Sequence, residues 1–282
     1  MNELMTDCTI CPHECHVDRT AGDTGDCGAS DKLLVASHGP HYGEEPEIVG
    51  NSFSGTIFFS GCNLTCEFCQ NYDISQLRAG RGMEVMDIVK IMLSLGASGA
   101  ANINFVTPTH FTPQLIEAIR AANARGLGVP IVWNSSGYEK PETLRMLRGL
   151  VDIYMPDFKY ISSEKSESYS GAADYFEYAG PALMEMHAQA GDLEVVDGQA
   201  RRGLLVRHLV LPGGQSDTRG IIDFIAENFG TNTYLNLMDQ YRPCYHANRF
   251  REISQPLERD EFAAAVDYAR RRGFTRPDYL YS

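Results

Sequence analysis

The sequence predicts an α/β protein whose core is a partial (β/α)6, TIM-like barrel, preceded by a short cysteine-rich extension. The chain has 282 residues, enough for one α/β domain of barrel size. Across residues 51–282, short apolar strands alternate with helical segments, a pattern typical of a parallel sheet with right-handed crossovers. Residues 1–50 are rich in Cys, Gly, Asp and His and show little periodicity, so we expect a metal-binding extension there. A doubly wound sheet fits the same alternation, and either architecture binds ligands at the carboxyl ends of its strands.

Six β/α units follow one another in the core. The helices carry apolar residues at helical spacing, as Val85, Ile88 and Met92 do in the first helix. Several helices begin at a proline, which suits the first helical turn. The pair Asp197-Gly198 indicates a hairpin turn that leads into the fifth strand. We expect strands at 56–59, 102–106, 130–133, 151–155, 203–211 and 234–238, and helices at 84–95, 113–124, 141–150, 181–189, 218–228 and 258–272.

The composition excludes several classes of function. The chain contains 43% hydrophobic and 22% charged residues, as ordinary globular proteins do. Its net charge of −13 argues against general binding to nucleic-acid backbones, which requires a basic surface. No apolar run approaches the roughly 20 residues that cross a bilayer, and the N-terminus lacks the pattern of a signal peptide. We therefore expect a cytoplasmic protein that does not bind membranes.

Three closely spaced cysteines are the strongest chemical signal in the chain. Cys62, Cys66 and Cys69 have the spacing C-x3-C-x2-C directly after the first strand. Four-iron clusters usually take four cysteines, so a triplet without a close fourth cysteine indicates a cluster with one iron open to another ligand. A structural zinc site is the alternative, but zinc requires four ligands and no nearby histidine completes the set.

A second group of cysteines lies in the extension. Cys8, Cys11, Cys15 and Cys27 offer four thiolates, which suits a closed metal site. Small segments with little apolar content often need a metal to fold. The residues leave open whether this site holds structural zinc or a second iron–sulfur cluster.

Polar side chains follow the predicted strands at the points where they end. Because the carboxyl ends of parallel strands meet at one edge, we expect these side chains to surround one site. The candidates are Thr107, Thr109, Asn134, Asp157, Lys159 and Arg207.

The cysteine triplet, preceded by Gly61 and containing Phe68 before its third cysteine, resembles the cluster motif of radical S-adenosylmethionine (SAM) enzymes. The segments VDIYMPDFK at 151–159 and VRHLVLPG at 206–213 are similar to the fourth and fifth strands of proteins like the pyruvate formate-lyase activating enzyme. The resemblance covers roughly residues 50–275. The family's Gly-Gly-Glu after the second strand is replaced here by residues 107–110, TPTH, and its Asp-Thr-Asn-Gly after the third strand by residues 134–137, NSSG.

The resemblance implies a 4Fe–4S cluster on the three thiolates, with the amine and carboxylate of SAM on the fourth iron. One electron from the reduced cluster then cleaves SAM to methionine and a 5′-deoxyadenosyl radical, which abstracts hydrogen from a substrate. It also implies that Phe68 lies near the adenine and that Asp157 and Lys159 lie near the SAM carboxylate. The residues after the second and third strands, Thr107, Thr109 and Asn134, would complete a modified SAM site.

Two functions from different classes follow. The favoured one is an oxygen-sensitive radical SAM oxidoreductase or activating enzyme that receives electrons from a donor such as flavodoxin or ferredoxin. Its substrate is a protein glycine, as for glycyl-radical-enzyme activases, or a small molecule or peptide. Arg207 would line the pocket. The alternative is a non-catalytic iron–sulfur protein that transfers electrons or binds metal.

Overall fold

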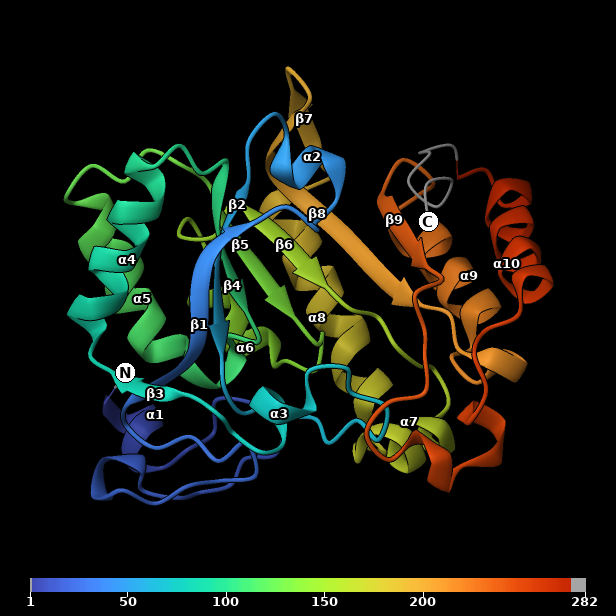
Figure 1. Cartoon of the computed structure of the whole chain (residues 1–282), viewed down its shortest axis with the longest axis horizontal. Coiled ribbons are helices and arrows are strands. Elements are labelled where there is room, and N and C mark those ends of the chain that lie inside the picture. The colour runs from blue at the N-terminus through green and yellow to red at the C-terminus, as the bar shows by residue number, and fades with distance from the viewer. Residues whose placement is uncertain (1, 275–282) are drawn as a thin grey trace.

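The computed structural model describes residues 2–274, which form a nine-stranded sheet with helices packed around it (Figure 1). The strands run in the order β3-β1-β2-β4-β5-β6-β8-β7, and β9 pairs with β8. All pairings among β2, β4, β5, β6, β8 and β9 are parallel. The strands are β1 (Leu33–His41), β2 (Ser54–Phe59), β3 (Arg81–Met83), β4 (Asn102–Val106), β5 (Ile131–Ser135), β6 (Ile153–Pro156), β7 (Glu194–Val196), β8 (Gln199–Leu209) and β9 (Tyr234–Met238).

The helices connect the parallel strands in the predicted order. In Figure 1, α4 and α5 lie at one end of the sheet, α8 lies behind its middle, and α9 and α10 lie at the other end. The α-helices are α1 (Asn2–Thr6), α2 (Pro46–Val49), α3 (Tyr72–Ser75), α4 (Val85–Ala97), α5 (Thr112–Asn123), α6 (Pro141–Arg145), α7 (Ser163–Ser170), α8 (Tyr175–Ala190), α9 (Thr218–Asn228) and α10 (Arg259–Arg271). Short 3-10 turns lie at Arg19–Ala21, Thr109–Phe111, Pro212–Gly214, Ala247–Arg249 and Arg251–Ile253.

The predicted α/β fold with six β/α units is therefore confirmed. The parallel strands curve as part of a barrel, and among the described residues no strand pairing joins β9 to β2, so the barrel stays open on that side. Among the described residues there is no helix with both the length and the apolar character needed to cross a membrane.

The two faces of the sheet differ in what covers them. Side chains alternate between faces along each strand. On the outer face, residues such as Phe105 and Trp133 belong to the main hydrophobic core beneath the helices. On the inner face, Val132 and Met155 pack with Ile48 of α2 in a separate, smaller cluster. Short α2 therefore covers one end of the inner face, and its Ile48 carbonyl accepts a hydrogen bond from the Asn102 side chain, 2.7 Å away.

The structure differs from the prediction in residues 1–50, which contribute a strand to the sheet. Strand β1 pairs antiparallel with β2 and with β3. Its sequence, LLVASHGPH, is apolar only in its first part and contains Gly39 and Pro40, so the alternation expected of a strand is missing. Its hydrogen-bond partners are the two neighbouring strands, β2 and β3.

Two helices differ in length from the prediction. The helix expected at 141–150 ends as α6 at Arg145, because i→i−3 bonds such as that from Leu147 N to Leu144 O tighten the following turn. The helix expected at 181–189 begins earlier, at Tyr175, and contains Pro181 in its interior. Its buried residues, among them Tyr175, continue the apolar stripe through this region, so packing outweighs the unfavourable proline.

Candidate functional site

The loop that follows β2 holds the three cysteines of the triplet. Cys66 is buried, and Cys62 and Cys69 are half-buried. Burial raises the pKa of the Cys62 and Cys66 thiols, while the nearby Lys159 ammonium acts in the opposite direction on both. These two thiols therefore stay protonated at neutral pH, and a bound metal's charge would be needed to hold them as thiolates.

Each sulfur of the triplet has one hydrogen-bonding partner. The Leu64 backbone N–H donates to Cys62 Sγ at 3.4 Å, and the Ser170 hydroxyl donates to Cys66 Sγ at 3.1 Å. The Ser75 hydroxyl lies 3.1 Å from Cys69 Sγ. The thiolates of a cluster bind different iron atoms and need not converge on one point. This donor set, three cysteine sulfurs with one hydrogen-bonding group each, fits an iron–sulfur cluster.

The triplet loop is anchored on both sides by segments far away in sequence. Backbone bonds run from Thr65 N to Ser170 O, 3.0 Å, and from Glu67 N to Tyr169 O, 2.9 Å, both at the C-terminal end of α7. On the other side, the Glu67 carbonyl accepts a bond from the His246 backbone N–H at 2.8 Å. The loop is thus held between α7 and the segment that follows β9.

Phe68 is buried within this arrangement. Its ring packs edge-on against Tyr241, with the ring centroids 5.8 Å apart, and Gln70 donates to the Gln240 carbonyl at 3.0 Å. These contacts join the first and last strand ends, which sequence spacing alone did not reveal.

Gly61, directly before the triplet, is placed against the N-terminal extension. It has φ = +84°, and a Cβ there would lie 2.4 Å from the Cys27 carbonyl oxygen. The extension contacts this loop again at His13, whose Nε2 lies 2.8 Å from the Asn63 carbonyl oxygen. The cysteine-rich extension therefore packs directly on the triplet loop.

Gly61→Ala is expected to lower the free energy of unfolding by more than about 1 kcal/mol, because the alanine adds a backbone clash to the cost of its positive φ. Gly126→Ala is the matched control, since Gly126 has φ = +87° and no atom near its Cβ position. In that variant the free energy of unfolding should fall by only about 1 kcal/mol, the cost of placing an alanine in the left-handed backbone conformation. Urea unfolding followed by circular dichroism measures both, and equal losses would contradict the close contact with Cys27.

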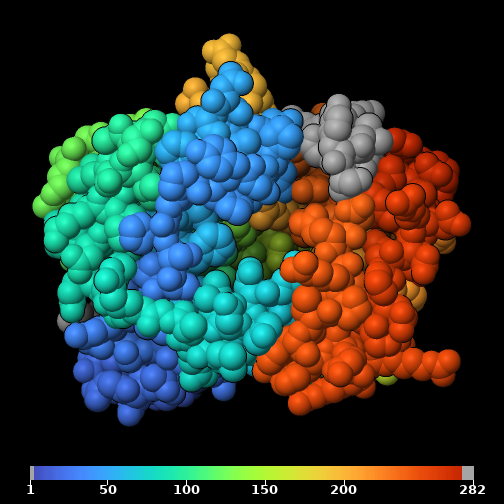
Figure 2. Space-filling model, viewed as in Figure 1, coloured from blue at the N-terminus to red at the C-terminus, as the bar shows by residue number. Residues whose placement is uncertain are grey.

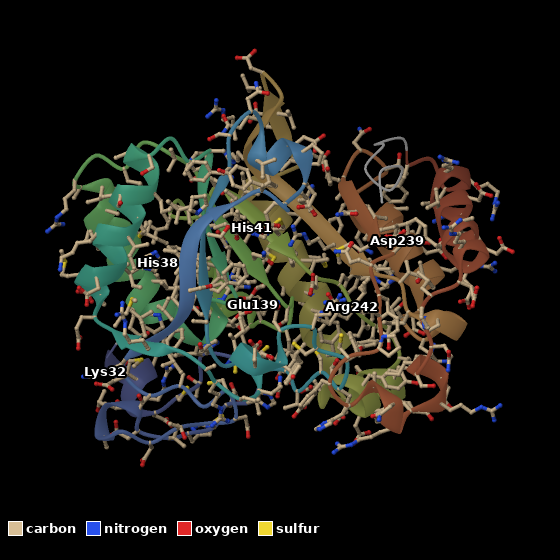
Figure 3. All side chains as sticks on the ribbon, viewed as in Figure 1. Lys32, His38, His41, Glu139, Asp239 and Arg242 are labelled. Carbon is tan, nitrogen blue, oxygen red and sulfur yellow. The ribbon has the colours of Figure 1, made fainter. Side chains whose placement is uncertain are left out.

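The carboxyl ends of the parallel strands surround a recess on the inner face. Towards these ends, the inward side chains change from fully buried to half-buried; they are Phe58, Val106, Asn134, Asp157, Arg207 and Met238. Figure 2 shows this hollow between the β1–α2 segment, the triplet loop and the segment after β9. In Figure 3, His41 lies on the β1 side, and Asp239 and Arg242 lie on the β9 side. Asn134, Asp157 and Arg207 thus share one face of the sheet.

Asp157 and Lys159 form an ion pair near the triplet. Lys159 Nζ lies 2.6 Å from Asp157 Oδ2. Burial would lower the pKa of Lys159, but the Asp157 carboxylate and the Cys66 sulfur hold it well above its ordinary value. The Tyr175 hydroxyl fixes the backbone here, because it accepts from Lys159 N and lies within hydrogen-bond distance of the Asp157 carbonyl, each at 3.0 Å. Lys159 therefore keeps its charge and interacts electrostatically with the Cys66 sulfur.

Thr107 and Thr109 occupy different environments. Thr107 is half-buried, has φ = +57°, and donates its backbone N–H to the Asn134 carbonyl at 2.9 Å. Thr109 is buried, and its hydroxyl donates to Glu139 Oε1 at 3.0 Å. Glu139 also accepts from the Trp133 indole, so the Thr109 hydroxyl belongs to a buried network behind the strand end.

Arg207 is held by two carboxylates that the sequence did not connect with it. It forms ion pairs with Glu44 and Glu45, both almost fully buried, and its Nε lies 2.7 Å from Glu45 Oε1. Asn104 donates to Glu44 at 2.8 Å, and Asn236 donates to Glu45 at 2.7 Å. Burial would raise the pKa of Glu45, but the Arg207 guanidinium holds it below its ordinary value. These ion pairs and hydrogen bonds therefore hold the segment before α2 against the inner face of the sheet.

The four cysteines of the extension lie near one another. Burial, together with smaller contributions from the Cys27, Cys15 and Cys8 thiols, raises the pKa of Cys11 to about 12. Across residues 2–274, however, no group of three or more His, Cys, Asp or Glu side chains is arranged to hold a single metal ion.

A separate cavity of about 620 Å³ lies outside the barrel. Residues from α9, α10 and the loops after β6 and β8 line it, including Ile161, Leu211 and Ala265. None of the predicted site residues contributes to it.

Comparisons with known proteins agree with this geometry. Residues 56–179 match the model of the Radical SAM superfamily. An uncharacterised protein of Methanocaldococcus jannaschii, MJ0674, is 32% identical over 277 residues, which cover 94% of this chain and 75% of that protein.

Several solved structures share the fold. HydG, a maturase of the [FeFe]-hydrogenase, aligns with a TM-score of 0.54 at 14% identity over 83% of this chain and 55% of its own. HydG from Carboxydothermus hydrogenoformans aligns with a TM-score of 0.55 at 13% identity over 79% of this chain and 52% of its own. Methylornithine synthase (PylB) aligns at 0.50 and 14% identity over 78% of this chain and 62% of its own. The chain thus spans about half the length of the HydG structures, and at these identities the likeness shows the fold alone.

The family model covers the triplet loop and the parallel strands up to α8, and the relative matches almost the whole chain. The chain belongs to the radical SAM superfamily.

Proposed function

We propose that this chain cleaves SAM reductively and uses the resulting radical to abstract hydrogen from a substrate bound in the recess. The observation that supports the proposal best is the triplet itself: three sulfurs, each with one hydrogen-bonding partner, at the edge of the recess and beside the Lys159 ammonium. Cys62, Cys66 and Cys69 would hold a 4Fe–4S cluster, which when bound supplies the electron that cleaves SAM.

The residues around the triplet have distinct roles in this proposal. Lys159, kept charged by Asp157, would bind the SAM carboxylate, since a shielded cation forms strong charge-assisted bonds. Phe68, which packs against Tyr241, would lie near the adenine. Thr107 and Asn134, joined through their backbones, would bind the amine end of SAM. The half-buried inner face then shields the reacting atoms from water.

The substrate belongs to one of two classes, a protein glycine, as for the activating enzymes, or a small molecule or peptide. Arg207 and its two carboxylates lie on the inner face of the recess, where a substrate would contact them. We propose a cytoplasmic enzyme that receives single electrons from a flavodoxin or ferredoxin.

Anaerobic reconstitution with iron and sulfide, followed by reduction with dithionite in the presence of SAM, tests the proposal. We expect 5′-deoxyadenosine and methionine in equal amounts. A protein with a verified cluster that forms neither product would instead be a non-catalytic iron–sulfur protein, the alternative that superfamily membership does not favour.

We also propose that Cys8, Cys11, Cys15 and Cys27 hold a second metal centre, either zinc or an iron–sulfur cluster. The proximity of their thiols supports it. A variant with Cys62, Cys66 and Cys69 replaced by Ala should retain metal, and adding Cys11→Ser should remove it. Elemental analysis with sulfide determination distinguishes zinc from iron. A triple variant without bound metal would contradict the second centre.

A further inference from the structure

A buried chain of hydroxyl groups ends on the Cys66 sulfur. The Tyr160 hydroxyl lies 3.0 Å from Ser170 Oγ, and Ser170 Oγ lies 3.1 Å from Cys66 Sγ. Tyr160 and Ser170 are at most 1% exposed, and Cys66 is 9% exposed. No water competes for these bonds at such burial.

The direction of each bond follows from the number of protons. A cysteine that binds iron is a thiolate, which only accepts hydrogen bonds. Ser170 must therefore donate its single hydroxyl proton to Cys66. The Ser170 oxygen can then only accept from Tyr160, so the order of donation is Tyr160 to Ser170 to Cys66. Hydrogen bonds in such a chain polarise and strengthen one another.

The backbone fixes the position of Ser170. It is the last residue of α7, which ends at Gly171 with φ = +68°. The Ser170 carbonyl accepts from Thr65 N at 3.0 Å, one residue before Cys66. A Cβ on Gly171 would lie 2.2 Å from Thr65 Oγ1, so the end of α7 and the triplet loop are in close contact. This backbone bond does not depend on the hydroxyl.

We propose that Ser170, oriented by Tyr160, is a positioning residue that raises the reduction potential of the cluster on Cys62, Cys66 and Cys69. The inference rests on the proposed function, because it requires that cluster. Reduction adds one electron and hence one negative charge to the cluster. A donor to a ligand sulfur stabilises the more negative state more strongly, and hydrogen bonds to sulfur are among the factors that set such potentials.

The other two sulfurs have weaker or less sheltered donors. The Leu64 N–H is 3.4 Å from Cys62 Sγ and comes from the backbone, so no side-chain change removes it. Ser75, the partner of Cys69, is only half-buried on short α3, where water can replace its hydroxyl. The largest effect of a single side chain is therefore expected at Ser170.

The test is a redox titration of the reconstituted holoenzyme, followed by the electron paramagnetic resonance (EPR) signal of the reduced cluster. Ser170→Ala should shift the midpoint potential to a more negative value and remove an exchangeable-deuteron coupling after transfer to D2O. Tyr160→Phe, which leaves the serine hydroxyl in place, should shift it less in the same direction. Ser166→Ala is the matched control, because Ser166 is also buried on α7 but its hydroxyl donates to the Ser163 carbonyl and not to a cysteine.

Iron and sulfide content and thermal unfolding should match the wild type in all variants, so that a shift reports on the hydrogen bond and not on folding. If Ser170→Ala shows the midpoint potential of the wild type and of Ser166→Ala, the inference is wrong. A wild-type chain that assembles no cluster, or that forms no 5′-deoxyadenosine, would contradict the proposed function instead.

Discussion

Cys66→Ala is expected to abolish the formation of 5′-deoxyadenosine. Cys66 is one of the three proposed cluster ligands, and its buried sulfur accepts a hydrogen bond from the Ser170 hydroxyl. Without it, two sulfurs remain for the cluster, and the iron retained after anaerobic reconstitution should fall sharply. Product is measured by chromatography after reduction in the presence of SAM, and iron and sulfide are measured in the same samples.

Cys244→Ala is the control for this experiment. Cys244 is half-buried and lies in the segment after β9, outside both cysteine groups. This variant should retain the iron and the product of the wild type. Normal product formation by Cys66→Ala would contradict the assignment of the triplet as the cluster ligands.

Arg207→Met is expected to lower the free energy of unfolding by about 3–5 kcal/mol, because it leaves Glu44 and Glu45 buried without a cation. Replacement of one partner of a buried ion pair costs more than the pair contributes, since the remaining charge stays desolvated. Urea unfolding of the cluster-free protein, followed by far-ultraviolet circular dichroism, measures the loss. Arg201→Met, an exposed change on the same strand β8, should change the stability by less than about 0.5 kcal/mol.

The pH dependence of this loss has a defined sign. The folded-state pKa of Glu45 lies below its ordinary value of 4.5, so its contribution is present above pH 4.5 and is lost as the pH falls through the folded-state pKa. In Arg207→Met the guanidinium is gone and burial raises that pKa, so the carboxyl takes up a proton and the penalty shrinks in acid. The gap between wild type and variant should therefore begin to narrow above pH 4.5, as the pH falls through the raised pKa of the variant, and narrow further below pH 4.5, where the wild type loses its own contribution. A gap that stays constant would contradict the ion pair.

The sequence predicted the parts of this fold that depend on local periodicity. Strands β4 and β9 and helix α9 have the predicted bounds, because apolar runs bounded by turn residues define them. The hairpin at Asp197-Gly198 also agrees, since its turn residues specify the connection. Strand β1 was missed because its stability comes from pairing with β2 and β3.

The sequence likewise indicated the parts of the site that depend on local patterns, but not the contacts between residues distant in sequence. The triplet and the strand ends follow from spacing and order, so Cys66, Asp157 and Lys159 could be proposed as site residues from the sequence. Ser170 lies 104 residues beyond Cys66, and no pattern in the sequence connects them. The partners of Arg207 had a weak signal, because Asn104 and Asn236 place amides in the middle of otherwise apolar strands and so indicate a polar layer inside the barrel.

The most direct test of SAM binding to the cluster is the EPR spectrum of the reduced, reconstituted protein with and without SAM. If Cys62, Cys66 and Cys69 leave one iron open, addition of SAM should change the g-values, and SAM labelled with 15N or 17O at its amine or carboxylate should show a coupling to the cluster. A reduced cluster whose spectrum is unchanged at saturating SAM would contradict the open iron and the function built on it.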